Sequence, residues 1–251
     1  MPLIANSQGN YRFLPGISPY SSGVIANDGF EIVHATLERP VPWHAGLLGV
    51  RQYLADQDRG QHALCGVELR CPRPHTLQGF IEFNTQYRSL LTEWEMMVDG
   101  VNPVARTNVA PVVNPPSETV LFGFSYTRPS AATRPTFVVA GGGELLDGGL
   151  DRRLIVRSGE TSEDAMLEKT RRVVEIMSGR LDGLGATNDL LSTIDVYSSH
   201  PVQQGLAEVI LPGLPAAAQL GVRWFYSRPP IEDIEFEMDM RGVVHDIVVA
   251  M

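Results

Sequence analysis

The sequence predicts an α+β fold built from two tandem units of similar design. The order strand, helix, strand, helix, strand, strand occurs twice along the 251 residues. Residues 129–136, which separate the two series, are rich in Pro, Ala and Arg, a composition typical of a linker. We therefore predict an N-terminal domain over residues 1–128, a linker over 129–136 and a C-terminal domain over 137–251.

The first series follows a segment rich in Asn, Gly and Pro that is expected on the surface. Strands are predicted over 30–37 and 63–70, with a short helix over 43–55 between them. Thr76 is the expected N-cap of a long amphipathic helix, whose apolar stripe runs from Leu77 to Val98. Two further strands, one around Arg106 and one over 117–127, complete the unit.

The second series begins with a strand over 137–140 that enters a run of three glycines. Neither a Gly-x-Gly-x-x-Gly helix start nor a following Lys-Ser/Thr accompanies the glycines, so we interpret them as a turn or a close backbone approach. Residues 161–164 are expected to cap a helix with an apolar stripe from Met166 to Leu181. The remaining expected elements are strands over 153–157, 190–197, 219–227, 234–240 and 242–249 and a helix over 200–211.

Composition excludes several function classes. A formal net charge of −9 argues against nucleic-acid binding, and no apolar run is long enough to span a membrane. The chain has 19 arginines but one lysine, Lys169, in a strongly charged helical run, which disfavours Schiff-base chemistry. Cys65 and Cys71 are too far apart on one strand to bridge, which fits a reducing cytoplasm. The histidines lack metal-ligand spacing, so we expect no metal.

The stretch 102–111 carries the most informative single residue. A helix ends before it, a proline follows, and a β-prone run then presents one cation, Arg106. A guanidinium matches a carboxylate in a two-pronged hydrogen bond, so the sequence points to a small ligand with a carboxylate. The alternative is a surface arginine at the end of a strand.

Five segments together resemble the reactive-intermediate deaminase family, also called Rid or YjgF. They are PYSSGVIANDGFEIVHA (19–35), PVARTNVAP (103–111), SEDAMLEKTRRVVEIM (162–177), LGATNDLLSTIDVYSSHP (184–201) and IEFEMD (234–239). The resemblance implies two chorismate-mutase-like domains, each a mixed sheet with two helices on one face. It also implies assembly of sheets into trimeric barrels, with ligand clefts between neighbouring units.

The resemblance assigns roles only in part. Tyr20, Arg106 and Glu235 match the family's active-site tyrosine, its carboxylate-binding arginine and its water-positioning glutamate. Each half alone is incomplete, so we expect a composite cleft that combines Tyr20 and Arg106 with Glu235. The alternatives are degenerate, non-catalytic halves, and a Glu235 that merely belongs to the polar face of a half-exposed strand.

Four further residues are candidates for substrate binding. His34 stands where the family motif has a serine, and Thr107 follows the arginine in the motif. Arg223 lies near the second half's vacant arginine position, and Tyr226 belongs to the same cationic and aromatic run. A structural role for the lone histidine and core packing of the aromatic residues are the alternatives.

The function implied is hydrolysis of the imine or enamine of a small unsaturated amino or imino acid, with ammonia release and no cofactor. Two alternatives stay open: a ring-opening amidohydrolase or chorismate-type lyase acting on a cyclic or aromatic acid, and a non-catalytic ligand-binding protein. The expected partners are a small carboxylate substrate and further copies of the chain in a homotrimer or higher homo-oligomer, with neither nucleic acid nor membrane.

Overall fold

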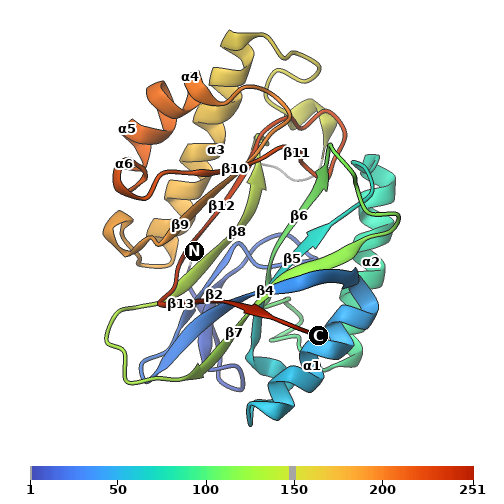
Figure 1. Cartoon of the computed structure of the whole chain (residues 1–251), viewed down its shortest axis with the longest axis vertical. Coiled ribbons are helices and arrows are strands. Elements are labelled where there is room, and N and C mark those ends of the chain that lie inside the picture. The colour runs from blue at the N-terminus through green and yellow to red at the C-terminus, as the bar shows by residue number, and fades with distance from the viewer. Residues whose placement is uncertain (1, 147–150) are drawn as a thin grey trace.

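The computed structural model describes residues 2–146 and 151–251 and has the mixed α+β architecture that the sequence predicts (Figure 1). Two twisted sheets lie between two groups of helices. The seven-stranded sheet has the order β1 (Ile4–Asn6), β2 (Tyr11–Leu14), β3 (Gly23–Ala26), β8 (Phe137–Gly143), β12 (Glu237–Gly242), β9 (Thr193–Tyr197) and β10 (Arg223–Phe225). The six-stranded sheet has the order β11 (Ser227–Arg228), β6 (Ala105–Pro111), β5 (Leu64–Arg70), β7 (Val120–Pro129), β4 (Phe30–Pro42) and β13 (His245–Val249).

The two sheets contain the same four-strand pattern, which confirms the tandem organisation. In the N-terminal half the order is β4-β7-β5-β6, and in the C-terminal half it is β8-β12-β9-β10. In both halves the first strand pairs antiparallel with the last, the last pairs antiparallel with the second, and the second pairs parallel with the third. Each half is therefore a chorismate-mutase-like unit.

Helices cover the outer face of each sheet. In the N-terminal half these are α1 (Trp43–Asp56) and α2 (Leu77–Glu93), which share one apolar core with β4, β5 and β7. In the C-terminal half they are α3 (Glu163–Gly183) and the helical stretch formed by α4 (Gln203–Gly205), the π-helix η4 (Leu206–Ile210), α5 (Leu211–Gly213) and α6 (Ala217–Leu220). Three short 3-10 turns complete the list: η1 (Gln61–Ala63), η2 (Arg152–Leu154) and η3 (Asn188–Leu190).

The halves exchange strands at both ends of the chain. Strands β1, β2 and β3 extend the sheet of the C-terminal half through the pairing of β3 with β8. Strand β13 extends the sheet of the N-terminal half by pairing parallel with β4. A third apolar cluster, with residues from β2, β3 and β8 on one side and β4, β5 and β6 on the other, joins the sheets. We keep the division at 129–136 as a proposal for where the two repeat units meet.

The helix starts follow the sequence, whereas several strands differ from it. The Thr76 side chain accepts a hydrogen bond from the Gly79 amide, and Ser162 caps α3 in the same way. The expected strand over 153–157 is wrong: Asp151 caps the turn η2 there. The expected long strand over 219–227 is also wrong, because Gly221 ends α6 with a φ of 71° and leaves only the short strands β10 and β11.

None of the helices in residues 2–146 and 151–251 combines the length and the apolar character that a membrane span requires.

Candidate active site

A cavity of about 580 Å³ lies where the two halves meet. Its walls come from α2, β6 and the segment before β3 on one side, and from α3, β8 and the start of β12 on the other. Tyr20, Arg106 and Glu237 are among the polar residues that line it. A cavity between the two halves therefore exists within a single chain, and its lining includes Tyr20 and Arg106 but has Glu237 in place of the expected Glu235.

Arg106 is buried in this cavity with part of its hydrogen-bonding capacity unused. Its Nη2 donates to Asn84 Oδ1 at 2.5 Å, whereas Nη1 has no partner among the described residues. The guanidinium carbon lies 4.6 Å from the ring centroid of Tyr87 and 4.7 Å from that of Tyr20. No carboxylate of the described residues lies within 4.0 Å of it. A buried cation without a counter-ion is costly, so this geometry suits an anionic ligand.

Glu237 supplies a carboxyl group whose proton is held unusually tightly. The residue is 5% exposed, and burial raises its pKa to about 8, with a further increase from the charge of Asp239. Arg180 and Arg106 act in the opposite direction, which shows that both guanidiniums lie within electrostatic reach of this carboxyl. At neutral pH most of Glu237 is protonated, so it can donate a proton as well as accept one.

The three glycines of β8 make room for these groups. A Cβ atom at Gly141 would lie 2.2 Å from Glu237 Oε1, and one at Gly142 would lie 3.1 Å from Arg180 Nη1. The interpretation of the run as a close backbone approach is confirmed. The side chains of Glu237 and Arg180 occupy the space that a Cβ atom at Gly141 or Gly142 would take.

Arg180 is a second guanidinium in the same cavity. It comes from α3, and its Nη1 donates to the carbonyl oxygens of Ala140 at 2.7 Å and Gly141 at 3.0 Å. These bonds fix the side chain against β8. Sequence reasoning did not single it out, because an arginine near the end of a helix looks like any solvated cation there.

Glu235 lies outside the cavity lining, two residues before Glu237. Its carboxylate contacts His200 Nε2 at 3.0 Å, and its backbone amide donates to Glu144 Oε1 at 2.7 Å. Glu144 also accepts from Phe236 N at 3.0 Å and pairs with the buried Lys169 at 3.0 Å. These contacts of Glu144, which we call the Glu144 clamp, occupy the backbone amides of Glu235 and Phe236. Strand β12 therefore begins at Glu237 instead of the expected residue 234. The motif IEFEMD thus contributes its second glutamate to the cavity.

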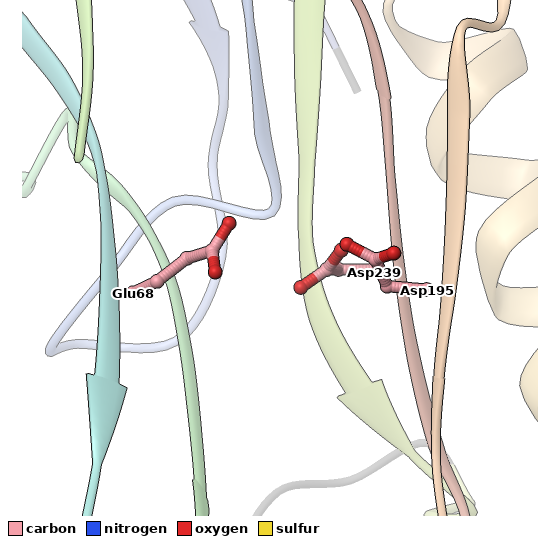
Figure 2. Close-up of side chains that lie close together, drawn as sticks. All are labelled: Glu68, Asp195 and Asp239. Atoms are coloured by element: carbon pink, nitrogen blue, oxygen red, sulfur yellow. The ribbon is translucent and has the colours of Figure 1, made fainter. Parts of the chain in front are cut away.

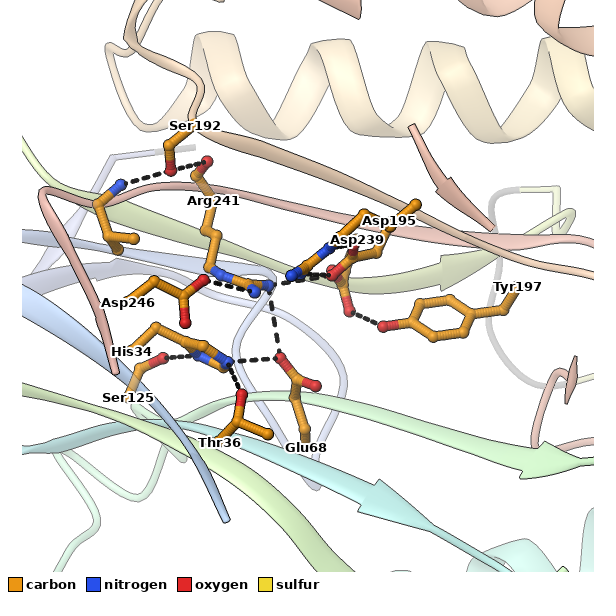
Figure 3. Close-up of polar contacts among 12 residues, drawn as sticks. His34, Thr36, Glu68, Ser125, Ser192, Asp195, Tyr197, Asp239, Arg241 and Asp246 are labelled. Carbon is orange, nitrogen blue, oxygen red and sulfur yellow. Dashed lines mark hydrogen bonds and ion pairs between the residues drawn. The ribbon is translucent and has the colours of Figure 1, made fainter. Parts of the chain in front are cut away.

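His34 and Arg223, two of the expected substrate-binding residues, belong to a different region, which we call the inter-sheet network. Figure 3 shows His34 within this network. The network comprises His34, Thr36, Glu68, Ser125, Asp195, Tyr197, Arg223, Asp239, Arg241 and Asp246. His34 contacts Ser125 Oγ at 3.1 Å and Glu68 Oε1 at 3.4 Å, and burial lowers its pKa to about 3. Arg223 forms a two-pronged pair with Asp195 at 2.6 and 2.7 Å.

The other two expected residues also lie away from the cavity. Thr107 follows Arg106 on β6 but faces the space between the sheets, beside Asp239 and Arg241. Tyr226 is half-exposed and packs edge to face with Trp224. The structure therefore brings Tyr20 and Arg106 together and separates Glu235, His34, Thr107, Arg223 and Tyr226 from them.

Three carboxylates of the inter-sheet network converge from both sheets (Figure 2). Oxygen atoms of Glu68, Asp195 and Asp239 lie within 4.8 Å of one another. Arg241 Nη1 lies 3.0 Å from Asp195 Oδ2 and 3.5 Å from Glu68 Oε1, so a guanidinium already neutralises the charge that a cation would balance. Tyr197 donates to Asp239 at 3.0 Å, and burial raises the pKa of Asp239 to about 8. The absence of a metal remains a prediction.

Two comparisons with known proteins match nearly the whole chain. The family model described as "2-aminomuconate deaminase CnbZ" matches residues 3–247. A 2-amino-5-chloromuconate deaminase from Comamonas testosteroni is 40% identical over 248 residues, which cover 96% of this chain and 97% of that protein. The expectation of a deaminase is confirmed by these two matches.

Solved structures resemble the chain more distantly. A chorismatase aligns with 13% identity and a TM-score of 0.48, covering 88% of this chain and 77% of its own. A YjgF-family protein from Neisseria meningitidis aligns with 16% identity and a TM-score of 0.24, covering 49% of this chain and 99% of its own. The family model and the Comamonas relative, each matched over nearly the whole chain, show that the chain belongs to the 2-aminomuconate deaminase (CnbZ) family.

Proposed function

We propose that the chain hydrolyses an unsaturated amino acid of the 2-aminomuconate type, releasing ammonia, in the cavity that contains Arg106, Tyr20 and Glu237. One observation carries the proposal: a buried guanidinium with an unpaired Nη1 lines the same cavity as a buried carboxyl group that keeps its proton at neutral pH. The first can hold a carboxylate, and the second can transfer a proton to and from the reacting atoms.

Arg106 binds the carboxylate next to the amino-bearing carbon. The unpaired Nη1 donates to this carboxylate. Nη2 is already bonded to Asn84, which prevents the guanidinium from rotating. Rings of Tyr20 and Tyr87 lie against the guanidinium and limit its contact with water. A charge-assisted hydrogen bond in such a site orients the substrate as well as binding it.

Glu237 transfers protons in three successive steps. Its carboxyl first gives a proton to the enamine carbon chain, which converts the C–N bond into an iminium and leaves a carboxylate. That carboxylate then takes a proton from a water molecule while the oxygen of this water bonds to the iminium carbon. In the third step the same proton passes to nitrogen and the C–N bond breaks, while the carboxylate takes the proton of the new hydroxyl group. Ammonia therefore leaves a 2-oxo acid, and the carboxyl group of Glu237 is restored. Water is the only co-reactant, and no cofactor is needed.

Tyr20 supports this sequence as a neutral hydrogen-bond donor. Burial raises the pKa of its phenol, and the carboxyl of Glu237 raises it further, against the effect of Arg106 and Arg180. The hydroxyl therefore stays protonated across the physiological range. It is placed to stabilise the developing hydroxyl or amino group of the tetrahedral intermediate.

The proposal extends to assembly and location. A homotrimer or larger homo-oligomer in the cytoplasm is supported by exposed apolar side chains near the sheet edges, among them Trp224, Tyr226 and Val113, and by the free thiols of Cys65 and Cys71. Light scattering of the purified protein tests the oligomeric state, and a monomer would contradict it.

The decisive experiment compares two glutamates that are two residues apart. Ammonia release from 2-aminomuconate is measured for wild type, Arg106→Met, Glu237→Gln and Glu235→Gln. We expect Arg106→Met and Glu237→Gln each to lose about 10²–10⁴-fold in kcat/KM, while Glu235→Gln stays within about tenfold of wild type. A wild type without turnover, or a Glu237→Gln variant as active as wild type, would contradict the proposal.

A further inference from the structure

The cavity contains one more guanidinium than the proposed reaction uses. Binding of one carboxylate and transfer of protons require Arg106 and Glu237. Arg180 lines the same cavity from the opposite side, on α3 of the C-terminal half. Within the described residues no carboxylate lies within 4.0 Å of either arginine.

The charges facing the cavity do not balance without a ligand. Arg172 and Glu175 also line it, and they lie 3.6 Å apart, so they compensate each other in part. Glu237 is largely uncharged at neutral pH. Arg106 and Arg180 therefore remain as two desolvated cations without an acidic partner among the described residues. A ligand with two negative charges would neutralise both.

Arg180 is also held in an orientation suited to binding. Both of its hydrogen bonds to the protein in the described residues use Nη1, which donates to the carbonyl oxygens of Ala140 and Gly141. The remaining N–H groups of the fork, on Nε and Nη2, are left for a ligand. Gly142 provides the space for this placement, since a Cβ there would contact Arg180 Nη1 and Met177.

The cavity wall beside these polar groups is apolar. Side chains of Ile17, Phe80, Leu145, Ile176, Ile231 and Ile234 contribute to it. An apolar wall bordered by two fixed cations fits a flat, unsaturated carbon chain that bears a carboxylate at each end.

We infer that Arg180 binds the second carboxylate of the substrate and makes the site selective for unsaturated dicarboxylates over monocarboxylates of the same length. This inference rests on the proposed function, because it assigns a second contact to the same ligand. Arg180 touches substrate at a distance from the reacting carbon. Its loss should therefore weaken binding of the dicarboxylate more than it slows the chemistry of bound substrate.

The test uses two unreactive ligands that differ in one carboxylate. trans,trans-Muconate carries a carboxylate at both ends of a diene chain, and sorbate, which has the same double-bond geometry, has a methyl group in place of one of them. Dissociation constants are measured by calorimetry at neutral pH for wild type, Arg180→Met, Arg180→Lys and Arg153→Met. The last is a matched control, because Arg153 is an exposed arginine that pairs with Asp151.

For wild type and Arg153→Met we expect muconate to bind roughly 10–100-fold more tightly than sorbate, the range of one charge-assisted hydrogen-bonded contact. In Arg180→Met this ratio falls to within about threefold, through weaker muconate binding and unchanged sorbate binding. Arg180→Lys, which keeps a positive charge but loses the planar fork, gives an intermediate ratio.

Each other outcome overturns the inference. An equal loss of affinity for both ligands in Arg180→Met and Arg180→Lys would assign Arg180 a structural role, and a wild type that binds both ligands equally would exclude a second carboxylate contact. Failure of the proposed function has a different signature: the muconate preference depends on Arg180 as expected, but wild type releases no ammonia from 2-aminomuconate. Thermal melting of each variant identifies any that fail to fold.

Discussion

The cavity and the inter-sheet network both place arginines near buried carboxyl groups. Among the described residues, the arginines of the network pair with carboxylates, whereas Arg106 and Arg180 of the cavity do not. In the network, Arg241 contacts Glu68, Asp195 and Asp246, and Arg223 contacts Asp195 through two bonds. In the cavity, Arg106 retains an unpaired Nη1, and no carboxylate of the described residues pairs with Arg180. Burial alone therefore does not distinguish the two regions. The presence of internal partners does.

The difference separates a region built for stability from one built for a ligand. A buried charge that is fully paired is neutral to moderately costly, whereas an unpaired one is expensive until something binds it. The network joins the two sheets and needs nothing from outside. The cavity keeps its charges available, which lowers the stability of the empty protein and raises its affinity for an anion.

Arg106→Met should separate the two regions most strongly. The variant should lose about 10²–10⁴-fold in kcat/KM, because the substrate carboxylate loses its charged hydrogen-bond partner. Its resistance to urea should equal or exceed that of wild type, since an unpaired buried cation has been removed. Steady-state kinetics and urea unfolding on the same preparation check both halves of the prediction. A marked loss of stability would mean that Arg106 is a structural residue.

Arg241→Leu should show the converse pattern. Removing this guanidinium leaves Glu68 and Asp195 buried without their shared cation, so we expect unfolding to become easier by about 3–5 kcal/mol. The folded fraction should bind muconate as wild type does. Urea unfolding with and without muconate measures both quantities. A stability within about 1 kcal/mol of wild type would show that the network is not what joins the sheets.

The pH dependence of stability sharpens the comparison. Glu237 and Asp239 have pKa values raised to about 8 in the folded chain, so the folded state holds more protons than the unfolded state below that pH. Their contribution to stability is complete below the unfolded pKa, near 4, and is lost as pH rises to about 8. His34 changes in the opposite sense, but only below about pH 6.5.

Between pH 6.5 and 8 we therefore expect the free energy of unfolding to fall with increasing pH. Glu237→Gln should flatten this slope by up to about 1.4 kcal/mol per pH unit. Urea titrations at several pH values measure the slope. Above about pH 8, kcat/KM of wild type should decrease, because the reaction begins with a proton from Glu237. An activity that rises through pH 8 would indicate that Glu237 starts as a base.

Asp246→Asn should have the smallest effect. Asp246 forms the outer end of the network, 40% exposed, at 3.2 Å from Arg241 Nη2. Exposed pairs contribute little, so the loss of stability should stay below about 1 kcal/mol. The comparison of this variant with Arg241→Leu tests whether the buried residues of the network, and not the exposed ones, account for its contribution to stability. A loss as large as that of Arg241→Leu would contradict the division.

Sequence reasoning located part of the site and had a physical reason to miss the rest. Arg106 and Tyr20 lie in local motifs, and the composite cleft followed from what each half lacks. Glu235, Glu237, Asp239 and Arg241 alternate along one segment, and period-two spacing places them on a common face without saying which one meets Arg106. That choice depends on the clamp by Glu144, a contact 91 residues away along the chain.

The fold shows the same limit. The repeated strand and helix order is visible in local patterns. The cap expected at Thr76 is confirmed, and Ser162 provides the cap that was expected within residues 161–164. Pairing partners of strands are not local, so the exchange of β1–β3 and β13 between the halves left no signal in the sequence. Arg180 gave no signal either, since its role depends on the approach of α3 to β8.

The exchanged strands bear on how the protein is made. The sheet of the N-terminal half lacks its β13 neighbour until residues 245–249 have been synthesised, while β3 must wait for β8 before β1–β3 can join a larger sheet. A ribosome that has translated only the first half therefore carries a chain with unpaired strand edges, which is prone to aggregation and a natural client for chaperones. The interlocked ends also mean that the two halves cannot be separated into independent genes without leaving both sheets incomplete.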